Sequence, residues 1–161
     1  MEQQATGQYL SFSLGGEEYG VDILKVREIK GWEPVRPLPD TPPYIRGVMD
    51  LRGLVVPIID LRSRFGLERA DCTATTVIIV LASRIGERQV IAGVVVDSVS
   101  DVLDLDSSAI RSAPDLGAEI DVGYIHGMVT LPERMVVLLD VEALLDPATL
   151  AMEVAEGRAR Q

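Results

Sequence analysis

Hydrophobic and polar positions alternate along most of the chain in short runs separated by turn residues. This alternation predicts strands at 9–14, 19–23, 48–51, 54–61, 76–82, 90–96, 99–105, 124–131 and 134–139. Gly15-Gly16 and Gly86 mark turns between neighbouring runs. Helices are expected only as short pieces, at 23–29, at 61–65 and after Asp146, a good N-cap that precedes Pro147. The pattern therefore predicts an all-β protein.

Residues 48–62, VMDLRGLVVPIIDLR, place a charged turn between two apolar strands. Arg52-Gly53 separates the strands, and Pro57 interrupts the second of them. Because proline cannot donate to a strand ladder, Pro57 predicts an edge strand or a bulge. Residues 31–43 hold five prolines and are expected to form an ordered connection, neither helix nor central strand.

An internal repeat divides the chain. Tyr44-Ile45-Arg46-Gly47 recurs as Tyr124-Ile125-His126-Gly127, and at the same offset of 80 residues Asp60 meets Asp140. Earlier, Gly20-Val21 matches Gly93-Val94 at an offset of 73. The repeat predicts two related β units of about five short strands each, packed together.

Charge and composition narrow the choice of function. The 161 residues are 47% hydrophobic, and 15 Lys and Arg stand against 25 Asp and Glu, a formal net charge of −10. That sign argues against binding to nucleic acid or an anionic membrane surface. The chain has no apolar run long enough to span a membrane, a polar N-terminus and a single cysteine, so a cytoplasmic protein without an intrachain disulfide is expected.

Chemistry-bearing residues are sparse. His126 is the single histidine, Cys72 lies in a polar connector, and the carboxylates of 97–106 lack the pattern of a calcium loop. No glycine-rich phosphate loop is present. We expect no enzyme, no cofactor and no metal site; an oligonucleotide-binding barrel and a hydrolase built on the acidic cluster are the weaker alternatives. Glu28 and Arg52 either pair with one another or are separately solvated, and their spacing alone does not decide which.

Three stretches resemble the CheW family of chemotaxis coupling proteins. They are YLSFSLGGEEYGVDILKVREI, TPPYIRGVMDLRGLVVPIIDLR and VVVDSVSDVL, and the likeness runs from about Tyr9 to Leu145. The resemblance implies two small five-stranded β-barrels of the SH3 or OB type, in tandem, with strands that can be exchanged between them. It implies one domain over 9–147, with repeat units at 9–70 and 75–146, and a helix and tail at 148–161.

The resemblance also implies a function. Members of this family are non-enzymatic adaptors that couple transmembrane chemoreceptors to the histidine kinase CheA, whose regulatory domain packs against them. The receptor's cytoplasmic tip is expected in a groove between the barrels, and the adaptor is expected in the cytoplasm, recruited to receptor arrays. The alternative is an adaptor of a related receptor–kinase pathway for surface motility.

Four positions match residues that the family uses to bind receptors: Val26, Glu28, Gly47 and Arg52. The resemblance implies that Arg52 pairs with Glu28. A side chain at Gly47, as in Gly47→Asp, is expected to meet a closely approaching backbone.

Kinase contacts are implied at two places. Asp115 and Leu116 belong to a loop matching a kinase-contact segment, although the family often has an aromatic residue where Leu116 stands. Val94 and Val96, together with the strand at 77–82, are expected on the main kinase-binding face.

Overall fold

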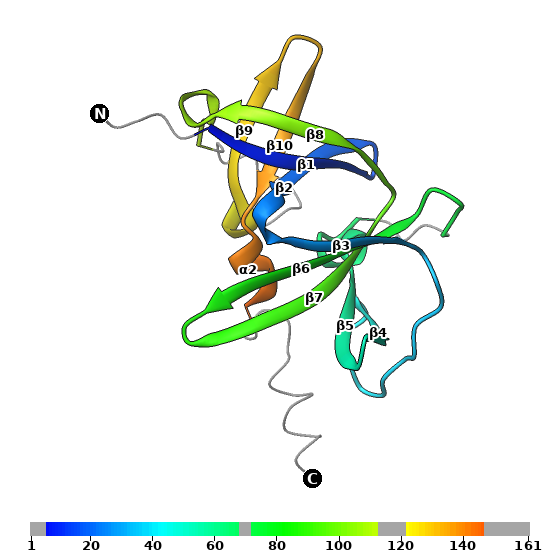
Figure 1. Ribbon diagram of the computed structural model, residues 1–161. Helices are drawn as coiled ribbons and strands as arrows, with labels where there is room; N and C mark the ends of the chain where they lie inside the picture. Colours follow the sequence, from blue (N-terminus) through cyan, green and yellow to red (C-terminus); the bar gives the residue numbers. More distant parts are fainter. Residues whose placement is uncertain (1–5, 68–71, 113–121, 147–161) are drawn as a thin grey trace.

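The computed structural model describes residues 6–67, 72–112 and 122–146. Within these ranges the chain consists of strands joined by short turns and single-turn helices (Figure 1). The elements, in chain order, are β1 (Thr6–Leu14), β2 (Glu17–Asp22), η1 (Ile23–Lys25), β3 (Val26–Gly31), β4 (Ile45–Leu51), β5 (Leu54–Asp60), α1 (Leu61–Arg64), β6 (Val77–Ile85), β7 (Arg88–Val96), β8 (Ser98–Asp106), η2 (Ser107–Ala109), η3 (Val122–Tyr124), β9 (Ile125–Leu131), β10 (Arg134–Leu139) and α2 (Val141–Leu145).

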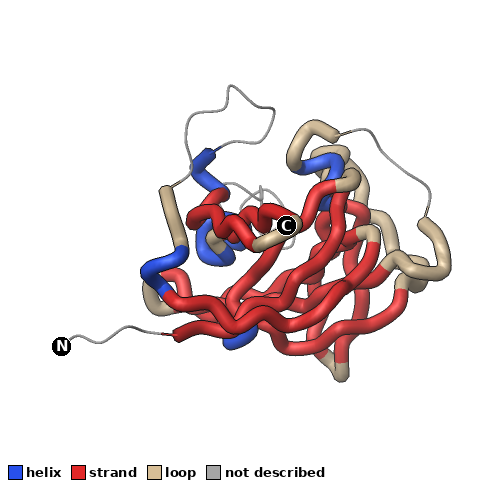
Figure 2. The backbone as a smooth tube through the Cα atoms, turned by 90° about the horizontal axis from the view of Figure 1, so that it is seen from above, coloured by secondary structure: helices blue, strands red, loops and turns tan. Residues whose placement is uncertain are grey.

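The strands form two five-stranded sheets. The first sheet has the order β8-β1-β2-β10-β9 and the second has the order β3-β6-β7-β5-β4. Figure 2 shows how strands dominate both, with only short helical pieces at their ends. The predicted all-β fold with two five-stranded units is confirmed.

The repeat is visible in the topology. If β1–β5 are matched in order with β6–β10, the two sheets have the same strand order. Each sheet, however, contains two adjacent strands from the other half of the chain. β1 and β2 lie in the first sheet beside β8 and β10, and β6 and β7 lie in the second sheet beside β3 and β5. Each exchanged hairpin joins its host sheet through one antiparallel pairing, β1 with β8 or β6 with β3, and one parallel pairing, β2 with β10 or β7 with β5. Strand exchange, which the resemblance allowed, is thus present.

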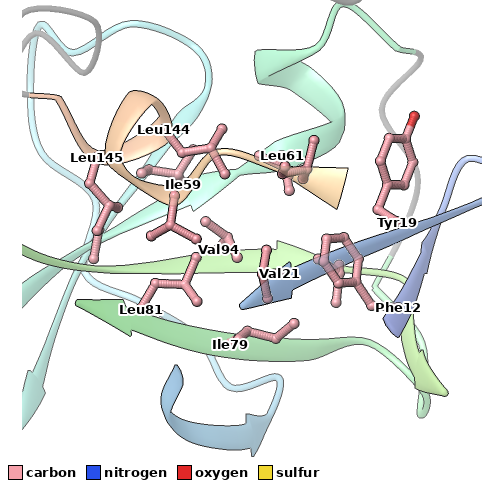
Figure 3. Close-up of a cluster of buried hydrophobic side chains, with 14 of the residues drawn as sticks. Phe12, Tyr19, Val21, Ile59, Leu61, Ile79, Leu81, Val94, Leu144 and Leu145 are labelled. Atoms are coloured by element: carbon pink, nitrogen blue, oxygen red, sulfur yellow. The ribbon is translucent and has the colours of Figure 1, made fainter. Parts of the chain in front are cut away.

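Three apolar clusters hold the sheets. One lies inside the second sheet around Ile58 and Val80, and another lies inside the first sheet around Val136 and Leu138. The largest lies between the sheets and includes side chains from both sheets and both α-helices (Figure 3). Its members include Phe12, Tyr19, Val21, Ile59, Leu61, Ile79, Leu81, Val94, Leu144 and Leu145.

The helix expected at 23–29 is wrong beyond its first turn. Asp22 caps only η1, accepting a hydrogen bond from the Leu24 N–H, and the chain then becomes the edge strand β3. Along β3 the apolar Ile29 is exposed while Glu28 is half-buried, so the apolar spacing does not report the buried face. A bulge between Val26 and Glu28 shifts the register with β6, but burial still alternates along the strand, and the half-buried face contains the charged Glu28 and Lys30.

Pro57 does not lie in an edge strand, so the first of the two predicted alternatives, an edge strand or a bulge, is wrong. β5 has β4 on one side and β7 on the other. Across from Pro57 is Val48, whose N–H and C=O both bond to Arg36 instead of β5. The ladder with β7 begins only at Ile58. Proline is tolerated because neither ladder needs a backbone N–H donor at position 57. The bulge of this hairpin lies on β4, between Ile45 and Gly47.

Two helical features complete the comparison with the sequence. The turn expected at 61–65 is α1, capped by Asp60. Its counterpart α2, capped by Asp140, was not predicted, although the equivalence of the two aspartates could have indicated it. The helix expected after Asp146 lies outside the described residues. Among the described helices, none is long and apolar enough to cross a membrane.

Candidate functional site

An ion pair joins the two edges of the second sheet. The Arg52 Nη1 lies 2.7 Å from the Glu28 Oε1. Glu28 belongs to β3 and Arg52 to the β4–β5 turn, and β3 and β4 are the two outer strands of that sheet. The expected pairing is therefore present, and it brings together residues that the sheet order places farthest apart.

The arginine of this pair faces solvent. Its side chain is 75% exposed, whereas that of Glu28 is 24% exposed. An ion pair so open to water contributes little to folding. The carboxylate fixes one end of the guanidinium, whose other N–H groups remain accessible to the carboxylates or carbonyls of a partner.

Exposed apolar residues are close to the pair in sequence. Leu54 and Val55, directly after the turn, are exposed to 47% and 65%, and Ile29, next to Glu28, is exposed as well. An open cavity of about 540 Å³ runs along β4 and is lined by Glu33, Pro34, Arg36, Val48, Met49, Asp50 and Val55. Exposed apolar residues around a fixed charge are typical of a protein-binding surface.

Gly47 is needed for a close backbone approach. Arg36 and Val48 exchange two backbone hydrogen bonds, which bring residues 36–37 alongside β4. A Cβ at Gly47, whose φ is +148°, would lie 2.1 Å from the Arg36 carbonyl oxygen and 2.9 Å from the Pro37 Cα. The expected backbone approach at Gly47 is confirmed.

The same arrangement occurs in the first sheet. There Arg111 pairs with Met128, and a Cβ at Gly127 would lie 2.9 Å from the Arg111 carbonyl oxygen. The glycine is thus part of the repeated scaffold. The arginine of the Arg52-Gly53 turn is not, because the equivalent turn has Pro132-Glu133.

Val26 lies at the start of β3, half-buried, and packs against the cluster between the sheets. Of the four receptor-binding candidates, the structure brings Glu28 and Arg52 into contact. It places Val26 against the central core and Gly47 against the connection that follows β3.

The predicted kinase face at Val94 and Val96 is wrong. Both side chains are 1% exposed and belong to the cluster between the sheets, so they have no surface to offer a partner. Most of the strand at 77–82 is buried in the same way. Sequence alone does not separate an apolar strand in a core from one at an interface. Asp115 and Leu116 lie outside the described residues.

The acidic residues of 97–106 have structural partners. Asp97 accepts hydrogen bonds from Arg62 and from the Gly15 N–H, and Asp101 accepts one from Ser11. Asp104 accepts one from Gln8, and Asp106 caps η2. These carboxylates bind neighbouring strands and turns, which is the ordinary role of such groups. Within the described part of the chain, no group of three or more potential metal ligands is found.

His126 and Cys72 differ in their surroundings. His126 is exposed on β9. The Cys72 Sγ accepts a hydrogen bond from Arg46, whose guanidinium also stacks on Trp32, 4.8 Å from the ring centroid. Arg46 lies 3.9 Å from the buried Asp60. These contacts hold Cys72, which precedes β6, against the second sheet.

Sequence reasoning missed an arginine between the two halves. The Arg64 guanidinium at the end of α1 lies over the Tyr44 ring at 4.6 Å and over the Tyr124 ring at 4.9 Å, and it donates to the Tyr124 hydroxyl. The two tyrosines occupy equivalent positions of the repeat. Their equivalence was visible in the sequence, but nothing there indicated what lies between them.

Comparisons with known proteins agree with this geometry. The family model described as the CheW-like domain matches residues 8–148. The chemotaxis protein CheW of Klebsiella aerogenes is 46% identical over 145 residues, covering 90% of this chain and 85% of the relative. CheW of Bacillus subtilis is 36% identical over 136 residues, covering 84% of each chain.

A solved structure gives the same result for the fold. The crystal structure of the scaffolding protein TtCheW from Thermoanaerobacter tengcongensis superposes with a TM-score of 0.75 at 30% identity, covering 84% of this chain and 90% of that one. Two sheets that exchange their central hairpins, a family model spanning nearly the whole chain and relatives of this similarity lead to one conclusion: the chain belongs to the CheW family.

Proposed function

We propose that this protein is a non-catalytic chemotaxis scaffold that couples chemoreceptors to the histidine kinase CheA. The observation that carries the proposal is the Arg52–Glu28 ion pair, which holds a solvent-facing guanidinium across the edges of the second sheet, two residues before the exposed Leu54. Family membership supplies the partners that such a surface serves. The chemotaxis names of the relatives favour this role over a surface-motility pathway.

The receptor-binding surface consists of Val26, Glu28, Gly47 and Arg52. Arg52 supplies the donors that a receptor contacts, and Glu28 holds it in place. Gly47 keeps residues 36–37 against β4, which shapes the cavity lined by Arg36, Val48 and Asp50. Val26 joins this edge to the core between the sheets.

We propose that the kinase contact is made by Asp115 and Leu116, as the family resemblance implies, with the regulatory domain of CheA as the partner. The protein acts in the cytoplasm and joins receptor arrays through its two partners. Residues 9–147 act as one domain built from units 9–70 and 75–146, followed by a helix and tail at 148–161; the shared strand order of the two sheets supports this division.

A three-component pull-down tests the proposal. A receptor cytoplasmic fragment on beads should retain CheA only when this protein is added. Arg52→Ala should weaken receptor binding by about tenfold, as expected when a central charged contact is lost, and leave CheA binding unchanged.

Arg134→Ala is the matched control. Arg134 begins β10 beside the equivalent turn of the first sheet and pairs with Glu18 at 3.1 Å. The Glu18 carboxylate already has one buried oxygen without a partner, so this variant should be less stable while binding the receptor normally. Equal loss of both partners in Arg52→Ala, or its unfolding, contradicts a receptor-binding role for Arg52.

A further inference from the structure

The turn that carries Arg52 has an unusual backbone. Arg52 and Gly53 are its two central residues, with φ of 54° and 88°. Positive φ at both positions defines a type I′ hairpin turn, for which Asn-Gly and Asp-Gly are preferred. Glycine adopts this conformation freely, whereas an arginine does so under strain, because its Cβ approaches the backbone.

The hairpin itself does not require this strain. In the equivalent β9–β10 turn, neither Pro132 nor Glu133 has a positive φ. The first repeat unit has a strained residue in its turn, whereas the second unit reverses the chain without one. The strain at Arg52 therefore indicates a role other than chain reversal. In this conformation the Arg52 guanidinium lies at Glu28, and this placement is the role that the contacts indicate.

Asp50 holds the turn in this conformation. Its Oδ1 accepts a hydrogen bond of 2.7 Å from the Gly53 N–H, which ties the end of β4 to the far side of the turn. Arg52 lies between the two bonded residues, so this bond limits the backbone rotations that would carry its side chain away from Glu28. The position equivalent to Asp50 in the second unit is Thr130.

We propose that Asp50 is a positioning residue for receptor binding: its carboxylate oxygen fixes the Arg52-Gly53 turn so that Arg52 is presented to both Glu28 and the receptor. The inference rests on the proposed function of Arg52. Although Asp50 also lines the cavity along β4, the inference assigns it a role through Arg52 alone, in which the acceptor oxygen matters and the charge does not.

Two substitutions separate the oxygen from the charge. Asp50→Ala removes the acceptor and should weaken binding of a receptor cytoplasmic fragment by about threefold to tenfold, the range of one ordinary hydrogen bond. Asp50→Asn keeps an acceptor oxygen and should bind like the unaltered protein. Binding of CheA should be the same in both. An Asn variant as weak as the Ala variant overturns the proposal, because charge would then be the cause.

A double-mutant cycle tests whether Asp50 acts through Arg52. In an Arg52→Ala background, Asp50→Ala should cause no further loss of receptor affinity. If its effect persists at full size, Asp50 acts directly and the positioning role is overturned.

A receptor-free measurement makes the two proposals separable. In Asp50→Ala, ¹⁵N relaxation should show lower order parameters for the Gly53 N–H and the Arg52 Nε–H, and in Asp50→Asn both should stay as in the unaltered protein. Unchanged order in Asp50→Ala overturns the positioning role alone. Normal receptor binding by Arg52→Ala overturns the receptor role of Arg52 and, with it, the use that the positioning serves.

Discussion

At the scale of single residues, Tyr19 links packing to ionisation. Its ring lies between Phe12 and Phe65, with centroid distances of 5.9 Å to each, in the cluster between the sheets. Burial, with a smaller contribution from the negative charge of Glu17, raises the pKa of Tyr19 to about 12. The neutral phenol is therefore favoured by the folded state.

The raised pKa predicts a loss of stability in alkali. A pKa that is higher in the folded state gives stability that is complete below the unfolded value near 10, and this stability is lost as the pH rises towards 12. By pH 11.5 the loss should amount to at most about 2 kcal/mol, and to less where solvent screens the phenolate. Urea unfolding at pH 9 and pH 11.5 measures it. Tyr19→Phe keeps the ring and should lose less stability over that interval; an equal loss in both proteins would assign the alkaline effect to other groups.

The sequence predicted single residues unevenly. The pairing of Arg52 with Glu28 could be expected from the family resemblance, because both residues lie within matching motifs. Asp50 could not, because its role depends on a hydrogen bond across a turn whose backbone type no residue pattern fixed. Val94 was predicted on the kinase-binding face but is buried, because the sequence pattern of an apolar strand is the same whether the strand faces the core or a partner.

At the scale of elements, α1 is a single turn whose last residue bridges the repeat. Arg64 contacts Tyr44, which precedes β4, and Tyr124, which precedes β9. Because β4 belongs to the second sheet and β9 to the first, α1 helps to fix the sheets relative to one another. The planar guanidinium can stack on two aromatic rings and donate to a phenol at the same time. The ammonium group of lysine is not planar and cannot stack in this way.

Replacing Arg64 should therefore weaken the junction of the sheets. We expect Arg64→Ala to lower the free energy of unfolding by about 1–2 kcal/mol and Arg64→Lys to restore only part of it. Urea denaturation measures both. The control is Arg84→Ala at an exposed position on β6, which should change stability by less than about 0.5 kcal/mol. Complete recovery in the lysine variant would show that charge alone is sufficient.

The strand pattern located every strand of the described residues except β3. It failed at β3, where Glu28 turns inward to meet Arg52 and Ile29 faces solvent. It also failed for Pro57, because the pairing of an inner strand can begin beyond a proline. In both cases the conformation depends on residues that are distant in sequence. The alternation of apolar and polar residues along one strand cannot predict which residues these are.

At the scale of the whole molecule, the repeat predicted two units of similar build but not which strands each sheet contains. The two sheets have the same strand order. Exchange of the β1-β2 and β6-β7 hairpins therefore leaves the sequence pattern of each strand unchanged. The exchange makes the halves depend on one another. β6 and β7 separate β3 from β5, and β1 and β2 separate β8 from β10.

This dependence gives a prediction about the divided chain. A first fragment, residues 1–71, would contain β3, β4 and β5 without the two strands between them, and a second, residues 72–161, would lack β1 and β2. Neither fragment can complete a sheet, and each would expose its part of the cluster between the sheets. We expect both to be unfolded alone and to assemble when mixed.

Circular dichroism and urea denaturation of each fragment and of their equimolar mixture check this expectation. The mixture should regain strand structure and a cooperative transition, whereas the separate fragments should show neither. A second fragment with Ile79→Asp is the matched control: Ile79 is fully buried between the sheets, and a charge there should prevent assembly. Cooperative unfolding of either fragment alone would mean that a sheet can form from one half of the chain. The exchanged hairpins would then be dispensable for folding, and the two sheets would be independent units that happen to share strands.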